Sequence, residues 1–287
     1  SSDVCSSDLG FNMVHGDGPG TGAALSAHPE VDLLSFTGST RAGQLVMTAA
    51  ADGIRRVALE LGGKSPNILF ADADLPAAIQ FSVGNCFSNS GQSCDAPTRL
   101  LVEKSVYDEA VTMAGRFAAG IKVGDQHQPG AHIGPLVNRI QFERVQGHIR
   151  KGIEEGARVV TGGLGKPKGF ETGFFVKPTL FADVTNDMHI ARNEIFGPVL
   201  VMIPFDGEDE AVRIGNDTPY GLAAYIQTGD EEKAQRVARR LRAGNVYING
   251  NYADIDVPFG GFKQSGIGRE NGPMGLEDFL ETKAITG

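Results

Sequence analysis

The chain has 287 residues, 41% of them apolar, and a net charge of −9. This length allows roughly two domains with hydrophobic cores, and the acidic balance argues against a nucleic-acid partner because phosphate backbones are repelled. No apolar stretch reaches the ~18 residues that span a bilayer, so we predict no membrane partner and a cytoplasmic location.

Residues 1–9 match no helix or strand pattern, and we treat them as a non-native leader. The first predicted elements are a strand at 31–36, a turn at 37–40 and a helix at 41–51 capped by Ser39 or Thr40. This order places helix N–H groups where they can bind a phosphate, although a simple turn is the alternative. Strands at 55–61 and 66–70 follow, and then a helix at 75–89 that begins near Asp72 or Asp74.

From residue 100 onward, predicted strands and helices alternate, which indicates parallel βαβ units and an α/β fold. The strand candidates are 100–103, 157–161, 199–205, 223–227 and 244–248. The helix candidates are 105–120, 139–155, 209–216 and 230–242. We also predict a surface loop at 162–173, a long ordered loop with a functional role at 249–272, and a terminal strand at 282–287.

Cys94 ends the run Gly-Gln-Ser-Cys, just beyond the helix predicted at 75–89. The other cysteines are Cys5 and Cys86, and the three imply no disulfide framework. Cysteines usually only pack in a core, and Cys86, within that helix, keeps this interpretation. Small polar neighbours leave Cys94 reachable by a substrate, so it is a candidate thiol nucleophile. Its neighbour Asp95 would oppose thiolate formation if the two side chains lay close together.

Two acids are further candidates. Glu60 lies within the apolar strand predicted at 55–61, where burial would raise its pKa toward that of a general base. A glutamate that faces solvent from an edge strand is the alternative. Glu194 begins the run Glu-Ile-Phe-Gly-Pro before the strand at 199–205, and its carboxylate could bind vicinal hydroxyls such as a ribose diol. A charged residue and a turn before a strand are, however, common.

Several motif classes do not occur in the sequence. The Gly-rich runs at 18–22 and 38–43 lack the Gly-x-Gly-x-x-Gly spacing, so turns are the alternative to a nucleotide site. The histidines have no metal-ligand spacing, which predicts no metal site. The missing Walker spacing argues against kinase and ATPase functions.

Six runs, in this order, resemble motifs of the aldehyde dehydrogenase superfamily, and the match extends from about Phe11 to the end of the chain. They lie at 35–40, 59–67, 91–94, 194–198, 258–266 and 268–270. The resemblance implies that Cys94 is the nucleophile and Glu60 the general base. It also implies a cofactor, NAD or NADP with NAD favoured, bound by residues that include Gly38, Ser39, Leu61, Gly62, Glu194 and Phe196.

The reaction implied by this resemblance oxidises a small-molecule aldehyde to a carboxylic acid. The Cys94 thiolate adds to the aldehyde, and donors that include its own N–H hold the oxyanion. Hydride then passes to the cofactor, and Glu60 activates the water that hydrolyses the thioester. A CoA-acylating enzyme is an alternative that the retention of Glu60 disfavours. A non-catalytic structural or binding relative is the other alternative, and the retention of both residues argues against it.

The resemblance implies an aldehyde-dehydrogenase-like α/β fold. We expect an incomplete Rossmann-like cofactor domain at 10–62, a complete α/β catalytic domain at 63–264, and a C-terminal return with an oligomerisation strand at 265–287. Family members extend further at the N-terminus, so we expect a C-terminal portion with little or no activity alone. A homodimer or homotetramer is implied, with the tail 280–287 joining another subunit's sheet. Residues 251–256 and Ser93 would line the substrate tunnel.

Overall fold

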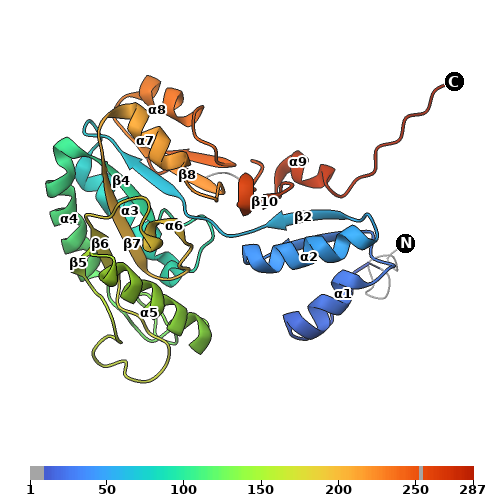
Figure 1. The fold of residues 1–287 in the computed structure, drawn as a ribbon, viewed down its shortest axis with the longest axis horizontal. Coiled ribbons are helices and arrows are strands. Elements are labelled where there is room, and N and C mark those ends of the chain that lie inside the picture. Colours follow the sequence, from blue (N-terminus) through green and yellow to red (C-terminus); the bar gives the residue numbers. More distant parts are fainter. Residues whose placement is uncertain (1–9, 252–254) are drawn as a thin grey trace.

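A computed structural model describes residues 10–251 and 255–287, and its strands form two sheets (Figure 1). Within these described residues, the larger sheet has seven strands in the order β5-β6-β7-β4-β3-β8-β9, and the smaller has three in the order β1-β2-β10. The strands of the larger sheet are β3 (Pro66–Leu69), β4 (Arg99–Glu103), β5 (Arg158–Thr161), β6 (Thr179–Ala182), β7 (Val199–Phe205), β8 (Ala223–Gln227) and β9 (Asn245–Ile248). Its pairs are parallel, as predicted, apart from the antiparallel pair β5–β6 at one edge.

Helices cover both faces of the larger sheet and make it a three-layer unit. Their bounds are α3 (Leu75–Phe87), α4 (Tyr107–Gly120), α5 (Arg139–Glu154), α6 (His189–Arg192), α7 (Gly207–Asn216) and α8 (Glu231–Ala238). On one face, α3 and α4 pack with Leu69 and Leu100 of the strands. On the other face, α5 to α8 pack with Ile68 and Leu101. Because both faces are covered, β7 is buried along almost its whole length and shows no alternation.

The smaller sheet joins segments that are far apart in the sequence. Its unit consists of α1 (Ala23–Ala27), β1 (Leu33–Thr37), α2 (Thr40–Asp52), β2 (Arg56–Glu60), β10 (Gly266–Ile267) and α9 (Gly272–Glu277). β1 and β2 are parallel and connected by α2. β10 pairs antiparallel with β2, so that Gly266 lies opposite Glu60. Figure 1 shows this unit beside the larger sheet, with β2 leading across to β3.

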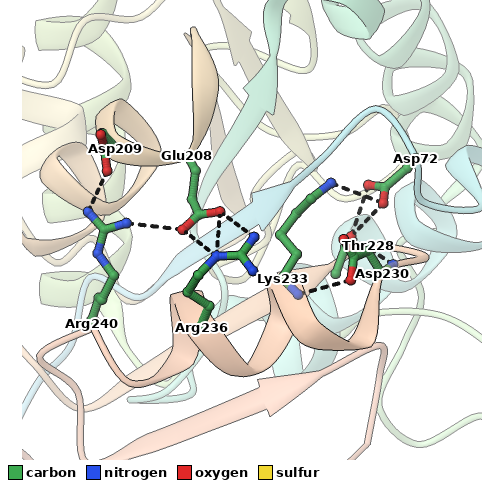
Figure 2. A network of polar contacts seen from close by, with 8 residues as sticks. All are labelled: Asp72, Glu208, Asp209, Thr228, Asp230, Lys233, Arg236 and Arg240. Carbon is green, nitrogen blue, oxygen red and sulfur yellow. Dashed lines mark hydrogen bonds and ion pairs between the residues drawn. The ribbon is translucent and has the colours of Figure 1, made fainter.

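A network of charged side chains links α8 with α7 and with the loop before α3 (Figure 2). Glu208 of α7 binds Arg236 at 2.9 Å and Arg240 at 3.0 Å. Lys233 of α8 reaches Asp72, in the loop before α3, at 3.1 Å. Because most of these side chains are partly exposed to solvent, each pair contributes little to stability.

Most predicted elements are confirmed to within a few residues. Ser39 caps α2 by accepting from the Ala42 N–H at 3.2 Å, and Asp74 caps α3 by accepting from the Ala77 N–H at 3.1 Å. The helix predicted at 230–242 ends at Ala238. The prediction missed α1, α6 and β6, which have only four or five residues each and are too short to show a hydrophobic period.

One prediction of chain conformation is wrong. Residues 249–272 are not a loop throughout, because β10 lies within them and owes its strand geometry to pairing with β2, a partner that local sequence does not reveal. The tail 282–287 pairs with no strand of the described chain and extends away from both sheets in Figure 1. Its predicted pairing with another subunit's sheet stays a prediction.

Some predictions fall partly outside what the structure describes. The leader at 1–9, with Cys5, and positions 252–254 of the tunnel loop lie outside the described residues. Across the described parts of the chain, no helix is long and apolar enough to cross a membrane.

Candidate active site

Glu60 is the last residue of β2 and is buried. The apolar residues Ala58 and Leu59 carry the strand into the interior, and the Glu60 carbonyl accepts from the Gly38 N–H at 3.0 Å, which fixes the strand end. The side-chain oxygen Oε2 has no hydrogen-bond partner among the described residues. A buried carboxylate oxygen without a partner is costly, so this position is a candidate for a functional role.

The pKa of Glu60 is raised to about 8. Burial is the largest cause, the carboxylates of Glu270 and Asp278 also raise this pKa, and the guanidinium of Arg269 lowers it. Gly260 lets these groups approach, since a Cβ there would lie 2.6 Å from Glu60 Oε1 and 2.9 Å from Arg269 Cδ. Glu60 therefore exchanges its proton near neutral pH, as a general base must.

Cys94 follows a tight left-handed turn. Asn89, Ser90 and Gly91 all have positive φ, at 50°, 57° and 71°. Only glycine adopts this conformation without strain, so the two other residues have to be held. Ser90 Oγ donates to the Gly134 carbonyl at 2.8 Å. The turn reverses the chain after α3 and leaves Cys94 partly exposed.

The linker between β2 and β3 touches the backbone of Cys94. A Cβ on Gly63 would lie 2.4 Å from the Cys94 carbonyl oxygen, so only glycine permits this contact. Since Glu60 precedes the linker directly, the candidate acid and the candidate nucleophile are neighbours in the fold, although they are far apart in the sequence.

The pKa of the Cys94 thiol is raised to about 11. Burial is the largest cause, the carboxylates of Asp95, Glu194 and Glu60 also raise this pKa, and a hydrogen bond from the backbone N–H of Cys94 lowers it. As the sequence suggested, Asp95 opposes thiolate formation. The thiol is neutral at pH 7, so a base has to accept its proton before the sulfur can attack.

Glu194 lies against the same linker. The Gly63 N–H donates to Glu194 Oε1 at 3.2 Å, and a Cβ on Gly62 would lie 2.1 Å from Oε2. Two glycines thus allow the carboxylate to pack directly on backbone. Burial raises the pKa of Glu194, whereas the Gly63 N–H and the charge of Lys64 lower it. A thiol and two carboxylates therefore lie around residues 61–63.

The N-terminus of α2 carries other predicted cofactor residues. The Gly38 N–H is occupied by a β2 carbonyl, and the Ser39 hydroxyl caps the helix. The N–H groups of Thr40 and Arg41 have no partner within the helix, so these two, rather than Gly38, are the donors available to a phosphate. The side chain of Leu61 is buried against α2, which leaves only its backbone for contact with a ligand.

Sequence reasoning gave no role to two residues that organise this site. Ser265 donates to the Gly62 carbonyl at 2.7 Å, and its own carbonyl accepts from the Leu61 N–H at 2.9 Å. Gln141, on α5, binds the segment that carries Phe196. Ser265 lies inside a recognised motif, whereas no local pattern identifies Gln141.

Comparison with known proteins identifies the family. The model described as "Aldehyde dehydrogenase family" matches residues 9–285. The chain belongs to this family. Among aldehyde dehydrogenases, a 3-succinoylsemialdehyde-pyridine dehydrogenase from Pseudomonas sp is 54% identical over 277 residues, which cover 96% of this chain and 58% of that relative.

Solved aldehyde dehydrogenases share the fold. A crystal structure from Bartonella henselae superposes with a TM-score of 0.94 at 52% identity, covering 96% of this chain and 58% of that one. A mutant of aldehyde dehydrogenase C from Pseudomonas syringae, in complex with NAD+ and octanal, gives a TM-score of 0.95 at 50% identity, covering 96% and 57%. The predicted family and α/β fold are confirmed. The chain spans about 58% of the length of the curated relatives it matches.

The structure also bears on metals. Within the residues that the structure describes, no group of three or more His, Cys, Asp or Glu side chains could hold a metal ion.

Proposed function

We propose that this chain carries the reacting groups of an NAD-dependent, non-acylating aldehyde dehydrogenase, with Cys94 as nucleophile and Glu60 as general base. One observation supports this most strongly. The linker 61–63 lies beside a half-buried thiol, the half-buried carboxylate of Glu194 and the buried carboxylate of Glu60, which has a pKa of about 8. A thiol with a nearby base is the arrangement that covalent acyl chemistry needs.

The reaction begins when Cys94 loses its proton. The pKa of the thiol is about 11, so solvent accepts this proton before the sulfur attacks, and Glu60 acts only in the second half of the reaction. The sulfur then forms a bond to the aldehyde carbon, and the oxyanion that results lies beside the Cys94 backbone N–H. A bound NAD+ would supply the acceptor for the hydride of this adduct, and Cys94 would then carry a thioester.

Glu60 acts in the second half of the reaction, which hydrolyses the thioester. Its carboxylate takes a proton from a water molecule, and the oxygen of that water attacks the thioester carbon. The carbon–sulfur bond breaks, the carboxylic acid leaves, and Cys94 recovers a proton. In the CoA-acylating alternative, the thiol of CoA would replace this water as the group that attacks the thioester carbon.

The residues around the linker fit a nicotinamide nucleotide. Glu194 offers a carboxylate to a ribose diol, in a cradle that any side chain at Gly62 would fill. The free N–H groups of the first turn of α2, beside Gly38 and Ser39, would face the pyrophosphate, and Phe196 would pack near the nicotinamide. We favour NAD over NADP because relatives of known structure are complexed with NAD+.

We also propose a small-molecule aldehyde as substrate, with Ser93 and the described part of 251–256 along its path. The division into 10–62, 63–264 and 265–287, a cytoplasmic location, and a homodimer or homotetramer belong to the same proposal. Exposed apolar side chains in the tail, Leu280 at 54% and Ile285 at 90%, support a contact between subunits there.

NADH formation from octanal and NAD+ tests this function, measured for the chain and for the chain extended at its N-terminus to the length of its relatives. Cys94→Ala is expected to abolish NADH formation, while the matched control Cys86→Ala, which removes a thiol buried in α3, is expected to retain it. Glu60→Gln should give a burst of NADH followed by slow turnover, because the thioester forms but is not hydrolysed. Equal loss in both cysteine variants, or full turnover in Glu60→Gln, would contradict the assignment. A rate that requires added CoA would favour the acylating alternative.

A further inference from the structure

The segment that carries Glu194 and Phe196 is held in an unfavourable conformation. It lies between α6 and β7 and has no regular secondary structure. Phe196 has a φ of 53°, in the left-handed region that a bulky side chain rarely adopts. Such a conformation persists only where surrounding contacts impose it. Something outside the segment therefore has to hold it.

The side-chain amide of Gln141 holds the segment by hydrogen bonds. Its Nε2 group donates to the Ile195 carbonyl and to the Phe196 carbonyl, both at 2.9 Å. An amide nitrogen has two N–H groups, so both are used on consecutive peptides. Gln141 is itself fixed, because its backbone N–H donates to the capping side chain of Asn138 at 2.9 Å in the first turn of α5.

Two close backbone approaches transmit this position to the rest of the site. A Cβ on Gly197 would lie 2.5 Å from Val145 Cγ2, so the segment rests directly on α5. A Cβ on Gly91 would lie 2.2 Å from the Gly197 carbonyl oxygen, so the turn before Cys94 rests directly on the segment. A shift of the segment away from α5 would therefore displace Glu194 and disturb the turn that carries the nucleophile.

We propose that Gln141 is a positioning residue for the nicotinamide nucleotide. By binding two consecutive carbonyls, it fixes the left-handed backbone of Phe196 and so sets the direction in which Glu194 presents its carboxylate. It acts through these two residues and takes no part in bond making. The proposal rests on the function proposed above, and it adds a residue on a different helix to the cofactor site.

Two measurements on the 287-residue chain test this role. The first is amide hydrogen exchange in the peptide covering 193–198, without any ligand. The second is NAD+ affinity by calorimetry. Gln141→Ala removes both donors, and Gln141→Glu keeps the shape but turns an acceptor toward two carbonyls. Gln146→Ala is the matched control, because it removes a buried glutamine of the same helix whose Oε1 accepts instead from the Gly165 N–H at 2.7 Å.

We expect faster exchange at 193–198 and about tenfold weaker NAD+ binding in both Gln141 variants, since two hydrogen bonds are lost. The Gln146 variant is expected to match the wild type in both measurements, even if its melting temperature falls. Unchanged exchange in the Gln141 variants, or faster exchange with unchanged affinity, overturns the proposal. Failure of the wild-type chain to bind NAD+ counts against the proposed function, and the exchange data then decide on Gln141 alone.

Discussion

Lys64 allows a direct test of how burial of a charged side chain changes its pKa and the stability of this protein. Its side chain is 1% exposed, and its Nζ has no hydrogen-bond partner among the described residues. Burial lowers the pKa of Lys64 from 10.5 to about 7, with smaller effects of Cys86, Arg99 and Glu194. Methionine has a similar length and no charge, so Lys64→Met changes little except the ammonium group.

The sign and size of the effect follow from this pKa. Between about pH 7 and pH 10.5 the unfolded chain holds the Lys64 proton and the folded chain does not, so wild-type stability rises with pH across this window. A displacement from 10.5 to about 7 corresponds to about 5 kcal/mol of penalty below the window, at about 1.36 kcal/mol per unit. Lys64→Met also removes a positive charge near Glu194, which offsets part of the stability that the variant gains. We therefore expect Lys64→Met to be more stable than wild type by about 2–4 kcal/mol at about pH 6.

Urea unfolding followed by circular dichroism measures this difference, at about pH 6 and again at about pH 9.5. Lys104→Met is the matched control, because the Lys104 side chain is 58% exposed and pairs with Asp206 at 3.6 Å on the surface. Its loss removes an exposed ion pair and is expected to change stability by at most about 1 kcal/mol at both pH values. A Lys64→Met chain that is less stable than wild type at the lower pH would refute the reasoning, as would an equal gain at both pH values.

Three further predictions concern the site and the surface. Turnover limited by deacylation is expected to rise with pH through about 8, because Glu60 must be ionised to accept a proton from water. A pH–rate profile checks this, and Glu60→Gln should lower the steady rate by about 10²–10⁴-fold and flatten the profile. Gly62→Ala is expected to weaken NAD+ binding by at least about tenfold in calorimetry, because the new Cβ would lie 2.1 Å from Glu194 Oε2, whereas Gly84→Ala in α3 meets nothing within 4 Å and serves as control. Glu208→Gln, which weakens partly exposed ion pairs of α8, should hardly move the urea midpoint, and a large shift would contradict the weak role given to that network.

The fold was predictable from the sequence where local pattern and tertiary environment agree. The strand at 199–205 is an apolar run because it is covered on both faces, so composition alone reveals it. Strand β10 has two residues and exists only through its pairing with β2, which no hydrophobic period encodes. The strand predicted at 282–287 finds no partner within the part of the chain that the structure describes, and its pairing with another subunit stays a prediction.

Some parts of the candidate site were likewise predictable from the sequence, and others were not. Cys94 and Glu60 were found from the sequence because each residue type is unusual in its surroundings. Their meeting depends on glycines in the linker, whose requirement is visible only as the short distances that a side chain would create there. Lys64 and Gln141 carry no local signal, because burial without a partner and bonds to distant carbonyls are properties of the folded chain.

The pairing between β2 and β10 has a consequence for how the protein acquires function during synthesis. Glu60 is made early. Burial is the largest cause of its raised pKa, and the charged groups of Arg269, Glu270 and Asp278, which also act on this pKa, are made much later. The bond from Ser265 to Gly62 joins positions 203 residues apart. The carboxylate of Glu60 therefore reaches its final surroundings only after residue 278 has been made and β10 has paired with β2.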